Sequence, residues 1–249
     1  MRFESRASSG LWALLSNLAA AALNGCTKMM QHTFPHRCVL CDSPTGQDRI
    51  CADCDAELPR LPLGRCTVCA VPLGSGEVCG ACLRQPPAFE SVWAAFAYEF
   101  PVDALIHAFK YGRRLALAPV LGEMLAGSAT PDVDVLVPMP LASGRLYERG
   151  FNQALEIART LSRRHRIPLD ATACRKVIET TPQARLPWKE RAKNVRRTFV
   201  CDTSLTGLRV AVVDDVLTTG ATLNELARAL RRAGAVSVAG WVVARTLPR

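Results

Sequence analysis

From about Phe89 to the C-terminus, short apolar runs alternate with longer segments in which apolar residues recur at helical spacing. Strands are predicted at 91–100, 132–140, 172–178, 208–215 and 235–246, and helices at 102–112, 115–127, 151–165 and 221–234. The strands are rich in β-branched residues and lack polar alternation, which is typical of strands buried on both faces. The order predicts an α/β fold with a mostly parallel, doubly wound sheet flanked by helices.

Two other zones precede this one. Residues 1–34 form an N-terminal extension, and a cysteine-rich zone occupies residues 35–85. The Gln85–Phe89 stretch "QPPAF" is typical of a linker, so the third zone, 89–249, is expected to be a separate domain. A chain of 249 residues is long enough for one sizeable domain and a small one.

The N-terminal extension carries the apolar stretch "LWALLSNLAAAALNGC" after two arginines, an outline shared with secretory signals. The stretch is interrupted by Asn17 and is shorter than the ~20 apolar residues that a membrane-spanning helix needs. We therefore expect an amphipathic helix or a frayed extension, no stable membrane span, and a cytoplasmic protein. A reducing compartment also suits the chemistry indicated by the motifs below.

The chain is basic, with a formal net charge of +9 at pH 7, and the excess is local. Between Arg145 and Arg197 there are 14 Lys or Arg against 5 Asp or Glu, a surplus (14 − 5 = 9) equal to that of the whole chain. This distribution favours a polyanionic partner, such as nucleic acid or a phosphorylated substrate.

Eight of the eleven cysteines form four CxxC pairs, and the second two pairs repeat the first two 28 residues later. The first set is Cys38, Cys41, Cys51 and Cys54, and the second is Cys66, Cys69, Cys79 and Cys82. Two CxxC pairs supply the four thiolates of a closed tetrahedral zinc site, so two structural zinc ions are expected. Disulfides and an iron–sulfur cluster are the alternatives to zinc.

The spacing leaves two ways to group the zinc ligands. Sequential grouping follows the repeat and closes short loops, so we favour it. Crossed grouping would join 38/41 to 66/69 and 51/54 to 79/82, with the same ligand count. Cys174 and Cys201 lie outside the pairs in strand-like segments, and we interpret them as core thiols.

The stretch "RVAVVDDVLTTGAT", residues 209–222, places two acids and a threonine-rich turn at the end of a buried strand. Backbone N–H groups at the start of the following helix and the hydroxyls of Thr218, Thr219 and Thr222 would bind a phosphate. Asp214 and Asp215 would repel a bare phosphate, so sugar hydroxyls and a divalent metal are their expected partners. The turn contains no lysine, which distinguishes it from a Walker A loop.

This pattern resembles the 5-phosphoribosyl 1-diphosphate (PRPP) motif of type I phosphoribosyltransferases. The "RLYERGFNQ" stretch, "ALIHAFKYGRR" at 104–114, "TPQARLPWKERAKNVRRTF" at 181–199 and the cysteine-rich head further resemble the ComF family, phosphoribosyltransferase-like proteins associated with competence for DNA uptake. The resemblance covers almost everything from Cys38 onward. It implies a double zinc ribbon followed along the chain by a phosphoribosyltransferase-like domain.

The resemblance also implies site residues. PRPP would be bound by Asp214, Asp215, Thr218, Thr219, Gly220, Ala221, Thr222, Arg145 and Arg149, with Asp214 and Asp215 as the catalytic pair and Mg²⁺ as cofactor. The loop Pro138–Gln153 would bind pyrophosphate, and Thr180–Arg197 would form a mobile flap. Lys110 and Tyr111 lie either on the substrate side or on the exposed face of an amphipathic helix.

The sequence leaves two functions open. The first is a Mg²⁺-dependent phosphoribosyltransferase linked to DNA uptake, acting on an acceptor that the sequence does not identify. The second is a non-catalytic module that binds single-stranded DNA, has DNA-uptake or recombination proteins as partners, and uses PRPP as a regulatory ligand. The basic segment and the zinc ribbons favour the second, whereas the complete acid pair and threonine turn favour at least PRPP binding.

Overall fold

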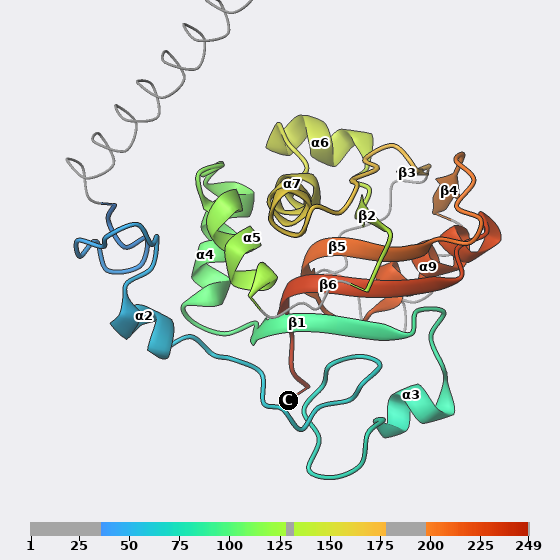
Figure 1. Cartoon of the computed structure of the whole chain (residues 1–249), viewed down its shortest axis with the longest axis horizontal. Helices are drawn as coiled ribbons and strands as arrows, with labels where there is room; N and C mark the ends of the chain where they lie inside the picture. The colour runs from blue at the N-terminus through green and yellow to red at the C-terminus, as the bar shows by residue number, and fades with distance from the viewer. Residues whose placement is uncertain (1–35, 128–131, 178–197, 249) are drawn as a thin grey trace, which may run out of the picture. The chain divides into compact units, whose positions relative to one another are not determined.

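The computed structural model describes residues 36–127, 132–177 and 198–248 (Figure 1). Its contacts divide the chain into two compact units, Met1–Glu57 and Leu58–Arg249. The division falls between the two cysteine repeats, so each repeat belongs to a different unit. The N-terminal extension predicted at 1–34 and the flap predicted at 180–197 lie outside the described residues.

Each cysteine repeat folds into the same local structure. In the first unit, Arg37 forms an isolated antiparallel bridge with Pro44, and the helix α2 spans Ala52–Ala56. In the second unit, the bridge joins Arg65 and Pro72, and the helix α3 spans Gly80–Arg84. Bridge and helix therefore recur 28 residues apart, as the cysteines do, which confirms the internal repeat.

The second unit continues into a four-stranded parallel sheet with strand order β1-β6-β5-β2. The strands are β1 Ser91–Ala97, β2 Val135–Pro138, β5 Arg209–Leu217 and β6 Ser237–Arg245. The helices are α4 Val102–Tyr111, α5 Leu117–Ala126, α6 Ser143–Arg149, α7 Gln153–His165 and α9 Ala221–Arg232. The predicted α/β fold with a mostly parallel sheet is confirmed.

Helices cover both faces of the sheet, which explains why the strands are apolar throughout. Leucines of α9 join a buried cluster with Val210 and Val212 of β5. The alternate residues of the strands face the other side, where Trp241 of β6 meets His165 at the end of α7. On this side α5 packs against α7, and both contact the sheet (Figure 1).

Two predicted boundaries are wrong in a way that affects the site. The strand β5 continues to Leu217 rather than ending at Asp215, because its pairing with β6 persists through Val216 and Leu217. Both acids therefore lie within the strand. The segment 138–153, predicted as a loop, contains the helix α6, which Gly150 ends in a left-handed conformation.

Two short antiparallel strands lie outside the main sheet: β3, Cys174–Lys176, and β4, Phe199–Cys201. Cys174 and Cys201 face each other in this pairing and form a disulfide. The interpretation of these residues as separate core thiols is wrong. The strand register places the two Cβ atoms side by side, which sequence reasoning missed because 27 residues separate the cysteines.

Peptide mapping tests this disulfide. Digestion of the alkylated, non-reduced chain is expected to yield a cross-linked peptide that contains both Cys174 and Cys201, and reduction should split it. Linkage of either residue to another cysteine would contradict the pairing.

Among the described residues, no helix is both long and apolar enough to cross a lipid bilayer. The apolar N-terminal stretch is not part of this finding, since it precedes residue 36.

Candidate functional site

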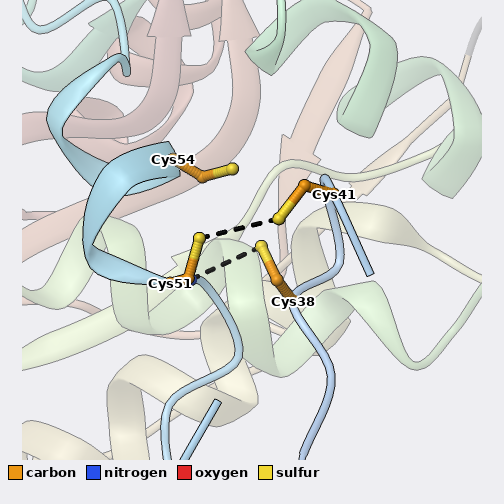
Figure 2. A group of neighbouring side chains, drawn as sticks. All are labelled: Cys38, Cys41, Cys51 and Cys54. Atoms are coloured by element: carbon orange, nitrogen blue, oxygen red, sulfur yellow. Dashed lines mark hydrogen bonds between the residues drawn. The ribbon is translucent and has the colours of Figure 1, made fainter. Parts of the chain in front are cut away.

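The sequential cysteine grouping is confirmed, because the four Sγ atoms of each repeat lie within 4.8 Å of one another. Figure 2 shows the sulfurs of the first set converging, two from the turn that carries Cys38 and Cys41 and two from the start of α2, where Cys51 and Cys54 lie. The Sγ atoms of Cys41 and Cys51 are 3.6 Å apart, as are those of Cys69 and Cys79. Tetrahedral zinc with Zn–S bonds of ~2.3 Å requires sulfurs roughly 3.8 Å apart, so both sets fit a zinc ion with no position left for water.

The local backbone prepares one thiolate in each set. The N–H of Cys51 donates to Cys38 Sγ, and the N–H of Cys79 donates to Cys66 Sγ (Figure 2 shows the first). Burial opposes ionisation of both thiols, but the backbone donors outweigh it and lower the pKa of Cys38 to about 6 and that of Cys66 to about 7. Thiolate is the form that binds zinc.

A cleft of about 220 Å³ opens at the carboxyl ends of β2 and β5, where ligands bind in open parallel sheets. We call it the β2–β5 cleft. Its lining includes the acid pair, Thr222 of α9, and basic and polar residues of α4, α6 and α7. An adjoining pocket of about 90 Å³, also lined by Asp214 and Thr222, lies against the turn at Thr218 and Gly220. Residues far apart in sequence thus meet at one place.

The two acids have different partners. Asp215 is buried and pairs with Lys110 of α4, with 2.8 Å between Oδ1 and Nζ. Burial alone would lower the pKa of Lys110, but the charge and hydrogen bond of Asp215 outweigh it and raise that pKa. Both partners line the cleft, so this ion pair belongs to the site. Of the two sequence alternatives for Lys110, the structure places it on the cleft side.

Asp214 has no such ion pair with any of the described residues. Burial, with the negative charge of Asp215, raises the pKa of Asp214 to about 7, although Lys110 and the N–H of Asp215 limit the rise. Within the described ranges, only the two cysteine sets bring three or more ligating side chains together. Mg²⁺ beside the acid pair would therefore take most of its oxygen ligands from the bound substrate and water, which is usual for this ion.

The threonine turn leads directly into α9. Gly220 precedes the helix with φ +79°, a left-handed conformation that favours glycine. Thr219 Oγ1 accepts a hydrogen bond from the N–H of Ala221, the first residue of the helix. Thr218 and Thr222 line the adjoining pocket, beside the positive end of the helix dipole. Thr219 and Ala221 thus shape the turn, whereas Thr218, Gly220 and Thr222 face the pocket.

The opposite wall of the cleft is basic. Arg145 and Arg149 of α6 both line it, and Arg149 donates to Gln153 Oε1 at 3.0 Å. Gln153 is 3% exposed, and its Nε2 atom has no hydrogen-bond partner among the described residues. A buried donor without a partner is costly, so a ligand oxygen in the cleft is its natural acceptor.

The sequence prediction included Asn152 and Gln153 only within the segment 138–153 and gave neither residue a role of its own. Asn152 caps α7 by accepting from the N–H of Ala154, and it also donates to the carbonyl of Met139 beside the acid pair. Gln153, the next residue along the chain, lines the cleft together with Asn152. The signal was present in the "GFNQ" stretch, since Asn before an apolar periodic segment is typical of a helix N-cap. Tyr111 is 62% exposed and lies beneath the Arg149 guanidinium.

Comparison with known proteins identifies the family. Residues 29–83 match the model of the double zinc ribbon domain. The DNA utilization protein YhgH of Escherichia coli (strain K12) is 32% identical over 223 residues, covering 84% of this chain and 90% of that protein. Competence protein F of Haemophilus influenzae is 30% identical, covering 87% of this chain and all of that protein. The chain belongs to the ComF family. Its N-terminal cysteine sets are the two zinc sites of a double zinc ribbon.

Other known proteins are less similar to this ComF protein. Competence protein ComFC of Bacillus subtilis is 27% identical over 227 residues. Among solved structures, a glutamine PRPP amidotransferase from B. subtilis matches 51% of this chain and 26% of its own, with a TM-score of 0.37 and 23% identity. A purine phosphoribosyltransferase from Pyrococcus horikoshii matches 53% of this chain and 70% of its own, with a TM-score of 0.26 and 26% identity.

Proposed function

We propose that this ComF protein binds PRPP together with Mg²⁺ in the β2–β5 cleft and acts as a phosphoribosyltransferase. One observation carries the proposal: an acid pair, a threonine turn at a helix N-terminus, and two arginines line one cleft and its adjoining pocket. These three parts match the three parts of PRPP, its ribose hydroxyls, its 5-phosphate and its pyrophosphate.

Each part of the ligand has a partner of suitable chemistry. Asp214 accepts hydrogen bonds from the ribose hydroxyls, while Lys110 holds Asp215 in place beside it. The turn at Thr218 and Gly220, with the amides at the start of α9, binds the 5-phosphate. Arg145, Arg149 and the Gln153 amide bind the pyrophosphate and satisfy the unpartnered Nε2 donor.

Transfer breaks the bond from ribose C1 to pyrophosphate and forms a bond from C1 to the acceptor's nucleophile. Mg²⁺ on the phosphate oxygens would neutralise charge on the leaving group. The arginines stabilise the same charge as it develops, and Asp214 keeps the ribose in the orientation needed for attack. The protein itself supplies no nucleophile in this scheme, because the acceptor brings its own.

Gln153→Met tests the site by calorimetry with PRPP, pyrophosphate and ribose 5-phosphate, each with Mg²⁺. Removing the donor should weaken PRPP and pyrophosphate about 10- to 100-fold and leave ribose 5-phosphate unchanged, since one buried hydrogen bond to a charged group contributes about 1.5–3 kcal/mol. The unliganded variant should stay close to wild type in stability, because it no longer buries an unpaired amide donor but also loses the oxygen that accepts from Arg149.

The double variant Asp214→Ala/Asp215→Ala is a second test of the same site. Unchanged PRPP affinity in that variant would exclude the assigned site, and a wild-type protein without PRPP affinity would exclude the function. Release of pyrophosphate from PRPP, screened over candidate acceptors, separates transfer from binding alone.

A second candidate function is the handling of single-stranded DNA, in keeping with the names of the DNA utilization and competence relatives. A basic and aromatic surface beside the cleft favours it. Tyr147 is 91% exposed and Tyr111 62% exposed, near Arg113, Arg145 and Arg149. Aromatic rings stack on bases while arginines contact phosphates.

Binding of a fluorescent oligothymidylate at several salt concentrations tests this function. Affinity should fall steeply with salt, as counterion release requires, and Tyr147→Ser should weaken binding about fivefold or more because one stacked base contributes about 1–3 kcal/mol. Absence of binding even at low salt would exclude the second function.

The zinc-bound thiolates and the phosphorylated substrate both suit the cytoplasm, where thiols stay reduced, and we place the protein there. Among the described cysteines, Cys174 and Cys201 form a disulfide and the other eight are free thiols.

A further inference from the structure

The two zinc ribbons share their spacing but differ in what surrounds them. Arg37 and Arg65 occupy equivalent repeat positions. Arg37 turns back on its own ribbon, where it pairs with Asp42 and donates to the Asp42 carbonyl. Arg65 instead donates to the carbonyl of Ala94 in β1 at 3.0 Å and lies over the Trp93 ring. The second ribbon thus attaches to the sheet that forms the cleft.

The residue after the second cysteine of each repeat shows the same contrast. Asp42 and Ala70 both have a left-handed backbone, with φ of 62° and 60°. The Asp42 side chain is 77% exposed, whereas Ala70 is fully buried within the core of the sheet. Val68 packs against the same core. The second ribbon is therefore part of the sheet unit, and the first lies in the other unit.

Arg245, at the end of β6, connects the second zinc site to the threonine turn. Its Nε donates to the carbonyl of Cys69, a zinc ligand, at 3.0 Å. Its Nη1 donates to the carbonyls of Leu217 and Thr218, at the start of the turn, and to that of Thr246. The side chain is buried, with 8% exposure, so its charge depends on these carbonyl partners.

A second route joins the same two places. After the last zinc ligand, Cys82, the chain passes beneath the turn. The Phe89 ring lies 3.7 Å from the position that a Cβ atom would occupy on Gly220, and the N–H of Ala88 donates to Asn224 Oδ1 in the first turn of α9 at 2.6 Å. The second ribbon and its exit segment thus support the turn from two sides.

We propose that the metal of the second ribbon holds the threonine turn, residues 217–222, in its ligand-binding conformation, and that Arg245 is the positioning residue that links them. The zinc ion fixes the turn between Cys66 and Cys69 and therefore the position of the Cys69 carbonyl. Arg245 donates to this carbonyl and to those of Leu217 and Thr218, so it holds the threonine turn at a fixed position relative to the zinc site. The first ribbon belongs to the other unit and serves as the comparison in the test below. The effect on PRPP affinity rests on the function proposed above, but the effect on the turn itself does not.

Cys82→Ser and Cys54→Ser in the full-length chain form a matched pair, because they remove equivalent ligands from the second and first zinc sites. Amide hydrogen exchange over 217–223, zinc content and PRPP affinity are measured in each. Cys82→Ser should speed exchange in this segment and weaken PRPP about tenfold, because part of the binding free energy is then needed to order the turn. Cys54→Ser should leave both at the wild-type level. Equal effects of the two variants would overturn the proposal.

Arg245→Met and Arg245→Lys keep every zinc ligand, so they test the link if Cys82→Ser does not fold. Arg245→Met should retain both zinc ions yet speed exchange over 217–223 and weaken PRPP. Lysine should restore part of the loss, since it keeps the charge without the planar fork. Wild-type exchange in Arg245→Met would overturn the proposal. If the variants change exchange as expected but the wild-type protein does not bind PRPP, the proposed function is excluded and the inference about the turn stands.

Discussion

Asp214→Asn is expected to weaken PRPP binding 10- to 100-fold while making the unliganded protein more stable at pH 8. The variant keeps an oxygen that can accept from a ribose hydroxyl but loses the negative charge, which contributes about 1.5–3 kcal/mol to such a hydrogen bond. Stability rises because the wild-type carboxylate is held beside Asp215 in surroundings that disfavour its charge. Calorimetry and thermal melting measure the two effects.

The pH dependence has a definite sign. Burial and the Asp215 charge raise the pKa of Asp214 from 3.8 in the unfolded chain to about 7 in the folded protein. Between these values the folded state holds the extra proton, so its stability falls as pH rises from about 4 to about 7. The loss is on the order of 2–4 kcal/mol, and Asn at this position removes it. PRPP affinity of the wild type should rise through the same window, because the ionised acid binds the ligand.

Asp215→Asn is the matched control, and it should act in the opposite direction on stability. It leaves the half-buried Lys110 ammonium, whose side chain is 19% exposed, without its carboxylate. Removing one partner of a fully buried pair costs about 3–5 kcal/mol, so a loss of about 2–3 kcal/mol is expected here. If Asp214→Asn were less stable than wild type at pH 8, or if both variants changed stability alike, the different environments assigned to the two acids would be wrong.

Patterns local in sequence predicted most of the fold. Apolar runs without polar alternation indicated parallel strands. Three of the four strands of the main sheet lie within predicted runs, and β5 extends two residues beyond its run. The cysteine spacing gave both zinc sites and favoured their grouping. These features could be read because each depends on residues at fixed short separations, such as the two-residue gap of a CxxC turn.

Features that depend on long-range packing were missed or left open. Nothing in the sequence distinguishes Asp214 from Asp215, and only the position of α4 gives Asp215 its lysine. The disulfide required the register of β3 and β4. The repeat likewise suggested two equivalent ribbons. The sequence did contain one sign of the difference, because the exposed Asp42 of the first repeat corresponds to the buried Ala70 of the second.

Gly122→Ala is expected to destabilise the sheet unit by about 3 kcal/mol, in spite of alanine's higher helix propensity. A Cβ atom at this position would lie 2.5 Å from Thr160 Cβ and 2.7 Å from its Cγ2, well inside any real contact. The two helices α5 and α7 would have to separate, and overpacking of this kind costs about 1–3 kcal/mol or more. Urea unfolding measures the change, and PRPP affinity should fall as well, because α7 begins at Gln153 in the cleft.

Gly127→Ala, at the end of the same helix, is the control. Its backbone is right-handed, with φ −65°, and an added Cβ would approach only the Glu123 carbonyl at 3.9 Å, an ordinary contact. Alanine there should be neutral or stabilising by up to about 1 kcal/mol. Thr160→Gly in the Gly122→Ala background should recover part of the loss, since it removes the atoms that clash. A Gly122→Ala protein as stable as Gly127→Ala would mean that α5 and α7 do not approach this closely, and the placement of Gln153 in the cleft would lose its support.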